Sequence, residues 1–165
     1  MLSKAMQDAI NQQINAELYS AYLYLSMSAY CAATNRVGSA SWMRVQSQEE
    51  QSHAMKLFDY VNDRGGRAML KAVAQPPTEY TSLLDIFQQV LEHEREVTGM
   101  ISRLYEAAVK ENDYPTQIML QWFITEQVEE ERNAAEVIAQ LKMIGDQGAA
   151  VMMLDRHLGM RAAGK

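Results

Sequence analysis

The sequence predicts an all-α protein, folded as a four-helix bundle with one long crossover and a short fifth helix at its C-terminal end. Three observations support this prediction. Four long segments carry apolar residues at helical spacing, each segment begins or ends at a typical capping or helix-breaking residue, and one connection is long enough to run back along a bundle. The 165 residues suit one domain, which we expect to span 1–165.

Local signals set the expected ends of the helices. Ser3 is a good N-cap for the first helix, and Gly65 with Gly66 supplies a stop for the second. Ser82 begins an imperfect capping box for the third helix, and Pro115 suits the first turn of the fourth. We therefore expect helices at about 4–34, 39–64, 83–112, 115–144 and 149–160.

The connection from Arg67 to Thr81 decides the topology. Short loops join antiparallel neighbours, whereas a parallel pair needs a connection as long as the bundle. This segment of about fifteen residues can reach about 50 Å when extended, against a length of about 39 Å for a helix of about twenty-six residues. Pro76 and Pro77 favour such an extended path. We therefore expect an up-down-down-up order.

Charge and cysteine content narrow the classes of partner. The formal net charge of −6 argues against a phosphate-binding surface, so we expect no nucleic-acid partner. Cys31 is the single cysteine and has no partner for an intrachain disulfide, which fits a reducing compartment. The N-terminal residues resemble neither a secretory signal nor a membrane span. A cytoplasmic protein without a membrane partner is the expectation.

Polar residues interrupt the apolar stripe near the middle of each long segment. One offset of 77 residues maps those of the first two segments onto those of the last two, so that Glu17 corresponds to Glu94. This indicates two superposable halves with all the polar residues facing inward at one level. The interrupting residues are Glu17 in the first segment, Glu50 and His53 in the second, Glu94 in the third, and Gln127 and Glu130 in the fourth.

Burying these carboxylates together requires a cation. Each unpaired buried carboxylate would cost several kcal/mol, and no Lys or Arg lies on the same stripes. Two divalent ions would balance the four glutamates, with His53 and Gln127 neutral. Carboxylates with one imidazole and no thiolate favour iron or manganese over structural zinc, and iron is our choice. In the alternative interpretation, water or protonation satisfies some of these side chains.

The sequence resembles the bacterial non-haem ferritins over essentially the whole chain. Three runs carry the resemblance: NAELYSAYLYLSMSAYCA, QEEQSHAMKLFDYV and LQWFITEQVEEE. The resemblance implies a ferritin-like four-helix bundle in which Glu17, Glu50 and His53 hold one iron ion. Glu50 would bridge to a second ion held by Glu94 and Glu130.

The resemblance also implies a third, weaker iron position next to the first two. The matching residues are Glu49, Glu126 and Glu129, with Glu130 shared between sites. An ordinary solvated acidic helix face is the alternative for these outer carboxylates.

Two aromatic residues match positions beside the iron site of the family. Tyr24 lies two turns beyond Glu17 and matches a tyrosine that donates an electron, and Trp122 would support it. Packing in the apolar core is the alternative for both side chains. His93 and His157 are isolated in the sequence, and we assign them no function.

Two positions depart from the haem-containing bacterioferritins. Gln127 with Glu130 replaces their second Glu-x-x-His motif, and Gln51 stands where they carry a haem-binding methionine. We therefore expect no haem. Loss of one carboxylate and one imidazole should also weaken the hold on the second iron, which favours release into a store.

The family implies ferroxidase activity, in which paired Fe(II) is oxidised by O2 or H2O2 and stored as hydrated ferric oxide inside a 24-subunit homo-oligomeric cage. Two other classes of function compete with this expectation. A peroxide-consuming or oxygenase-type di-iron enzyme without storage would resemble a rubrerythrin lacking its rubredoxin module, and the missing Cys-x-x-Cys pair weakens it. A scaffolding or dimerising bundle leaves the aligned inward carboxylates unexplained.

Overall fold

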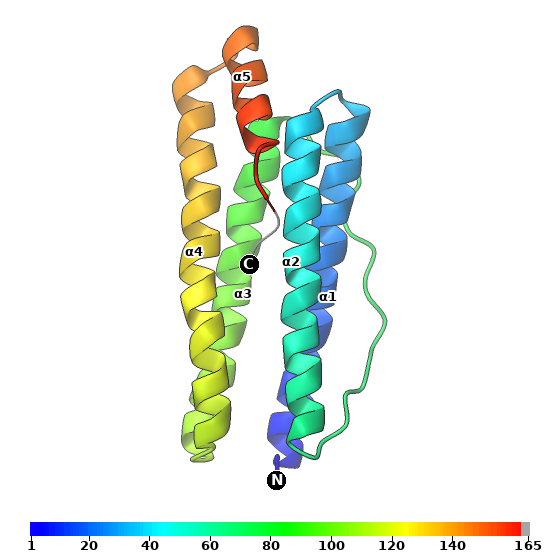
Figure 1. Cartoon of the computed structure of the whole chain (residues 1–165), viewed down its shortest axis with the longest axis vertical. Helices are drawn as coiled ribbons and strands as arrows, with labels where there is room; N and C mark the ends of the chain where they lie inside the picture. The colour runs from blue at the N-terminus through cyan, green and yellow to red at the C-terminus, as the bar shows by residue number, and fades with distance from the viewer. Residues whose placement is uncertain (163–165) are drawn as a thin grey trace.

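The regular structure of the chain is entirely helical in the computed structural model, which describes residues 1–162. Its helices are α1 (Lys4–Ala33), α2 (Val37–Asp63), α3 (Leu83–Lys110), α4 (Tyr114–Ile144) and α5 (Gly148–Leu158). The four long helices lie side by side, and α5 folds back against one end of the bundle (Figure 1). The predicted four-helix bundle with a short C-terminal helix is confirmed. Within residues 1–162, no helix combines the length and apolar character needed to cross a membrane.

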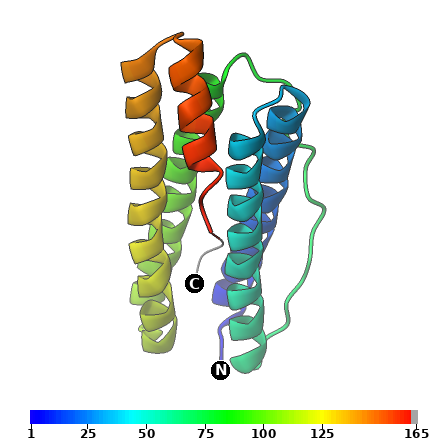
Figure 2. The same cartoon turned by 45° about the horizontal axis from the view of Figure 1, so that its top comes forward.

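The crossover, residues 64–82, runs along the outside of α1 for the length of the bundle (Figures 1 and 2). Side chains of α1 hold it in place. Asn11 Nδ2 donates to the carbonyl oxygen of Arg67 at 3.1 Å, and Ser26 Oγ donates to that of Pro77 at 2.6 Å. Because this segment returns to the other end of the bundle, α2 and α3 run parallel, which confirms the predicted up-down-down-up order.

The N-terminal caps follow the sequence signals. Ser3 Oγ accepts a hydrogen bond from the backbone nitrogen of Met6 at 3.0 Å, and Ser82 Oγ accepts one from that of Asp85 at 3.0 Å. Asp85 Oδ2 in turn accepts from the backbone nitrogen of Thr81 at 2.9 Å. The return hydrogen bond of this capping box thus comes from the residue before the N-cap Ser82 instead of from Ser82 itself.

Some helix ends differ from the prediction. α2 begins at Val37 instead of residue 39, because Asp155 accepts hydrogen bonds from the backbone nitrogens of Gly38 and Ser39 at 2.9 and 2.8 Å. This cap comes from α5 and has no local signal. α3 stops before Asn112, whose left-handed φ of 55° ends the helix. The remaining differences are one or two residues: α1 ends at Ala33, α2 at Asp63 and α5 at Leu158, while α4 begins at Tyr114 and α5 at Gly148.

The start of α2 is also where α5 docks. A methyl group on Gly38 would stand 1.7 Å from the carbonyl oxygen of Asp155, so this contact requires glycine. Gly159 lies against Gly38 from the other side of the contact. Docking buries Leu154 and Leu158 against the end of the bundle. The chain that follows α5 is thereby directed back towards the middle of α2.

Two apolar clusters fill the bundle, one on each side of a polar layer. Ile14 on α1 belongs to one cluster and Leu23 to the other. Glu17 lies between them in the sequence of α1 and is 1% exposed. Burial of each large apolar side chain stabilises the fold by about 1.5–3 kcal/mol, so the two clusters can offset the burial of polar groups between them.

Candidate metal centre

The polar layer of the bundle brings together the residues that interrupt the apolar stripes. They come from all four long helices, and none is more than 5% exposed. The residues are Glu17 of α1, Glu50 and His53 of α2, Glu94 of α3, and Gln127 and Glu130 of α4. The inward orientation expected from the periodicity of each helix is therefore what the structure has.

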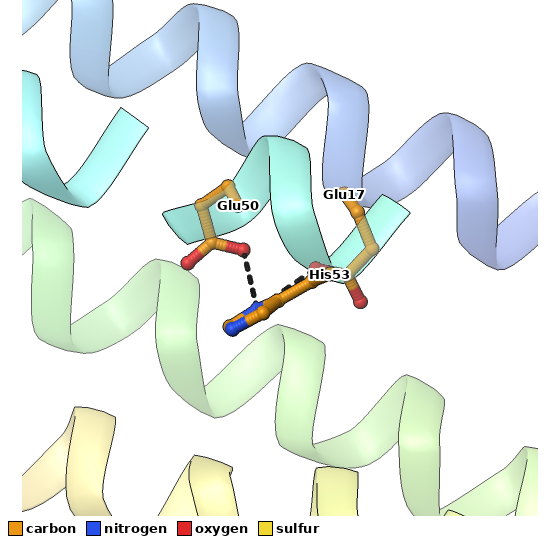
Figure 3. Close-up of side chains that lie close together, drawn as sticks. All are labelled: Glu17, Glu50 and His53. Atoms are coloured by element: carbon orange, nitrogen blue, oxygen red, sulfur yellow. Dashed lines mark ion pairs between the residues drawn. The ribbon is translucent and has the colours of Figure 1, made fainter. Parts of the chain in front are cut away.

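The first group of potential ligands contains Glu17, Glu50 and His53, whose nearest ligand atoms all lie within 4.8 Å of one another. His53 Nδ1 lies 3.3 Å from Glu50 Oε2 and 4.0 Å from Glu17 Oε2 (Figure 3). Glu17 Oε2 is buried and has no hydrogen-bond partner among the described residues. A buried carboxylate oxygen without a donor is costly, and a cation between these side chains would satisfy it.

The second group contains Glu50, Glu94 and Glu130, again with ligand atoms within 4.8 Å of one another. Glu50 is a member of both groups, so its carboxylate is suited to bridge two ions. Gln127 lies beside the second group and donates from Nε2 to Glu94 Oε2 at 3.0 Å. The amide therefore occupies Oε2 of Glu94 and leaves Oε1 for other contacts.

A third group joins His53 to Glu126 and Glu130 at the outer side of the cluster. These residues line a hollow of about 540 Å³ together with Glu49 and Glu129. Its composition fits a further cation position. The tight group differs from the expected set, because it includes His53, whereas Glu49 and Glu129 line the hollow without belonging to the group.

Glu49 and Glu129 line the hollow but belong to ion pairs. Glu129 Oε1 lies 3.7 Å from Nη2 of Arg132 on the exposed face of α4. Glu49 forms a short ion pair with Arg161, which follows α5. No Lys or Arg lies on the stripes that carry the cluster, as the sequence indicates, but Arg161 approaches it from the chain beyond α5. No local pattern in the sequence identifies Arg161 as a neighbour of the site.

Two glutamines that sequence reasoning did not assign hold the carboxylates in place. Gln13 Nε2 donates to Glu17 Oε1 at 2.7 Å. Gln46 Nε2 donates to Glu130 Oε2 at 2.6 Å and lies 3.2 Å from Glu50 Oε1. Each glutamine lies four residues before a site glutamate on the same helix face. This i, i+4 spacing is the sequence signal from which the two glutamines could have been assigned to the site.

Burial and mutual repulsion oppose ionisation of the glutamates. Burial, followed by the charge of Glu50, raises the pKa of Glu17 well above its ordinary value. Burial and the charges of Glu94 and Glu130 do the same to the pKa of Glu50. Burial and Glu94 raise the pKa of Glu130 to about 8. Full ionisation of the cluster at neutral pH therefore needs added positive charge between the carboxylates.

Tyr24 contacts the second group directly. Its hydroxyl donates a short hydrogen bond to Glu94 Oε1, and burial together with the Glu94 charge raises the pKa of the phenol. His93 is not isolated, in contrast to its position in the sequence. Its ring meets that of Tyr24 edge-on at 6.1 Å, and its Nε2 lies 2.7 Å from Ser20 Oγ. Burial lowers the pKa of His93.

Trp122 lies on the outer side of the first group. Its ring meets that of His53 edge-on with centroids 5.2 Å apart. Lys56 Nζ lies 4.2 Å from the centre of the indole ring. Trp122 is 38% exposed, so it forms part of the wall between the cluster and solvent instead of the apolar core.

Taken together, the fold and the cluster define a carboxylate-rich metal-binding four-helix bundle. A family model described as a ferritin-like domain matches residues 7–144. The chain belongs to the ferritin family. The comparisons indicate a ferritin subunit of the iron-storage type.

Relatives and solved structures agree with this assignment. The chain is 42% identical over 161 residues to a bacterial non-haem ferritin of Bacteroides fragilis, and the match covers 98% of this chain and 100% of the relative. It is 39% identical over 158 residues to a bacterial non-haem ferritin of Escherichia coli, and the match covers 96% of this chain and 96% of the relative. An engineered closed form of the Archaeoglobus fulgidus ferritin matches with a TM-score of 0.98 and 49% identity, covering 99% of this chain and 100% of that one. A humanized archaeal ferritin has a TM-score of 0.99 and 46% identity, with full coverage of both chains.

Proposed function

We propose that the buried cluster is a ferroxidase centre, at which two Fe(II) ions are bound and oxidised before storage. The observation that carries this proposal is that Glu50 belongs to two ligand groups at once. Glu17 Oε2, which is buried without a hydrogen-bond partner in the described chain, supports a cation in the first group. Two divalent ions would also balance the four buried glutamates.

In this proposal, each ion has its own set of ligands and shares one. Glu17, Glu50 and His53 bind the first Fe(II), and Glu50 bridges to the second, which Glu94 and Glu130 hold. Gln127 lies beside the second ion and contributes a neutral amide. The mixture of carboxylate and imidazole suits iron, which accepts both kinds of ligand.

The proposed reaction conserves atoms and charge. Two Fe(II) ions give up one electron each, and O2 accepts both electrons with two protons to become H2O2. When H2O2 is the oxidant, the two electrons and two protons convert it to water. Hydrolysis of Fe(III) to hydrated ferric oxide releases protons. The protein contributes pairing of the ions and an environment that keeps the glutamates ionised only while the cations are present.

We further propose that Tyr24 supplies an electron to the site and that Trp122 supports it. The hydrogen bond from Tyr24 to Glu94 supports a direct coupling to the second ion. No haem takes part in this proposal, because Gln51 on α2 stands where the bacterioferritins carry a haem-binding methionine. A third, weaker iron position in the outer hollow involves Glu49, Glu126, Glu129 and Glu130.

Storage requires a closed assembly, and we propose a 24-subunit cage of identical chains in the cytoplasm. The described surface carries exposed large apolar side chains that contacts between copies would cover, including Val37, Tyr114, Ile118, Val128 and Met143. The buried free thiol of Cys31, whose pKa burial raises to about 11, fits a reducing compartment.

Aerobic addition of Fe(II) to the metal-free protein tests the ferroxidase proposal. We expect Glu50→Ala and His53→Ala to lower the initial rate of oxidation at least tenfold, because each removes a ligand. Glu92→Ala, which changes an exposed glutamate of α3 outside the cluster, is the matched control. Oxidation by both site variants at the wild-type rate would overturn the proposal.

The competing function is a small di-iron enzyme without storage. The same cluster supports both functions, so the number of subunits in the assembly is what distinguishes the storage cage from the small enzyme. Size-exclusion chromatography should give a species of about 450 kDa for a 24-subunit cage of 18.7 kDa chains. A species of about 20–40 kDa would favour the small enzyme.

A further inference from the structure

Arg161, which follows α5, reaches into the outer hollow of the metal centre. One arm of its guanidinium group forms the short ion pair with Glu49 Oε2, and the other donates from Nη1 to Gln46 Oε1 at 2.7 Å. The guanidinium also lies 4.4 Å from the centre of the Trp42 ring. The side chains of Arg161 and Glu49 are 20% and 19% exposed, so this pair is largely withdrawn from solvent.

The position of Arg161 depends on the docking of α5. Asp155 holds α5 against the start of α2 through the backbone nitrogens of Gly38 and Ser39 and through Ser39 Oγ, which donates at 2.6 Å. Leu158 is buried in the same contact. Arg161 comes three residues later and is therefore delivered to the side of the cluster that faces the hollow.

The charge of Arg161 acts on the ligands of the centre. It opposes the rise in the pKa of Glu130, as do Gln46 and His53. Arg161 also fixes the orientation of Gln46, because it occupies the amide oxygen and leaves Nε2 to face Glu50 and Glu130. The guanidinium of Arg161 thus contacts the outer carboxylate of Glu49. It also orders the Gln46 amide, which supports the inner carboxylates of Glu50 and Glu130.

We propose that Arg161 is a positioning residue that narrows the outer hollow by holding Glu49, and that a divalent cation in this hollow must displace Arg161 to gain Glu49 as a ligand. The inference rests on the proposed third cation position of the ferroxidase centre. The guanidinium already partly neutralises the outer carboxylates, and its charge repels an incoming ion. Binding of a third ion and docking of Arg161 on Glu49 are therefore coupled, each opposing the other.

This coupling explains why a third position would be weaker than the inner two. Among the described residues, no Lys or Arg side chain forms an ion pair with the inner carboxylates, and Glu17 Oε2 lacks any hydrogen-bond partner. Glu49, in contrast, already binds a charged partner whose planar fork suits a carboxylate and an amide oxygen together. An ion at the outer position gains Glu49 only by breaking those contacts.

Calorimetric titration of the metal-free protein with Zn(II), which undergoes no oxidation, tests the inference. We expect two tight sites and one weak site per chain in the wild type. Arg161→Gln removes the charge and should tighten the weak site about tenfold, the size expected for one partly buried ion pair. Arg161→Lys retains a charge and should return the weak site towards the wild-type affinity. Glu49→Gln, which removes the contested ligand, should weaken it in either background.

Tryptophan fluorescence supplies a second measurement that a purely structural role would not affect. In the Trp122→Phe background, Trp42 is the remaining tryptophan, and it contacts Arg161. Zn(II) added beyond two equivalents should change its emission as the guanidinium leaves. The same addition should have no effect when Arg161→Gln is combined with Trp122→Phe.

The outcomes separate this inference from the function on which it rests. If the two tight sites are present but the weak site has the same affinity in wild type and Arg161→Gln, the role of Arg161 is wrong and the ferroxidase proposal stands. If no tight site exists in the wild type, both proposals fail. Size-exclusion chromatography and circular dichroism of each variant establish that its fold and assembly are unchanged.

Discussion

Gln127 donates its side-chain amide to Glu94 Oε2 at 3.0 Å, and the same nitrogen lies 3.2 Å from the backbone carbonyl oxygen of Glu94. This contact ties α4 to α3 at the level of the cluster. It also places a neutral amide where the twofold relationship between the halves of the chain matches Gln127 to Glu50. The second ligand group therefore has one carboxylate fewer than a symmetric site would have.

Gln127→Glu should restore that symmetry. The additional carboxylate next to Glu94 should tighten the second inner Zn(II) site of the metal-free protein about tenfold, because it adds both a ligand and a negative charge. Calorimetric titration measures the change, and Gln121→Glu, on the exposed face of α4, controls for charge alone. A second site of unchanged affinity in Gln127→Glu would contradict the placement of Gln127 beside the ion.

The metal-free protein should lose stability as the pH rises. The pKa of Glu130 is about 8 in the folded protein, above its ordinary value of 4.5, and the pKa values of Glu17 and Glu50 shift in the same direction. The folded state thus binds more protons than the unfolded state across this window. Its stability is greatest below the unfolded pKa and falls as pH rises through the folded pKa.

Thermal unfolding of the metal-free protein measures this loss. Between about pH 5 and about pH 8, the unfolding temperature should fall by roughly 5–10 °C. Zn(II) should remove most of the decrease, because it replaces the protons that the folded state otherwise holds. Glu130→Gln should reduce the slope. An unfolding temperature that rises with pH over this window would be inconsistent with the raised pKa values.

Tyr24→Phe should slow iron oxidation without disturbing the core. Tyr24 is completely buried and phenylalanine retains its ring, so the core packing is kept while the phenol hydroxyl and its hydrogen bond to Glu94 are lost. We expect the rate to fall about tenfold, the kinetic equivalent of about 1.4 kcal/mol for one hydrogen bond to a charged group. Stopped-flow absorbance measures the rate, with Tyr22→Phe at a half-exposed position of the same helix as the control. Equal rates for the two variants would remove Tyr24 from the mechanism.

Asp155→Ala should release α5 from the start of α2. The variant loses the acceptor for Gly38 and Ser39, and we expect the free energy of unfolding to decrease by about 1–2 kcal/mol, as for loss of a helix N-cap. Chemical denaturation measures the decrease, and Asp146→Ala, in the exposed loop before α5, is the control. Trypsin should cleave after Arg161 faster in Asp155→Ala than in the wild type. Equal cleavage rates would show that Asp155 does not hold this segment.

The same variant connects the docking of α5 to the outer hollow. If Arg161 reaches Glu49 only because α5 is docked, Asp155→Ala should tighten the weak Zn(II) site in the same direction as Arg161→Gln. An Asp155→Ala protein with released α5 and a wild-type weak site would separate the two contacts.

Most of the helical architecture was predictable because it depends on local signals. Ser3 and Ser82 are N-caps whose hydrogen bonds lie within one turn, and the apolar stripe on each helix sets which face is buried. The polar residues on those stripes were predictable as inward-facing for the same reason. Gln13 and Gln46 could also have been found, since each precedes a site glutamate by four residues on one helix.

The early start of α2 and the environment of His93 were not predictable in this way. The cap of α2 comes from Asp155, which is more than a hundred residues away in the chain. His93 lies next to Tyr24 only because α3 packs against α1. Contacts of this kind depend on how helices meet, which no periodicity within a single helix encodes.

The sequence by itself determined the helices, their order and the glutamates that face the core, because periodicity, capping and loop length act over a few residues at a time. The family resemblance already implied a bridging Glu50, whereas only the tertiary structure decided that the ligand atoms of each group lie within 4.8 Å of one another and that Arg161 reaches Glu49. The physical reason is that distances between side chains on different helices depend on packing and on the docking of α5. A cation's neighbours are set by those distances and not by spacing along the chain.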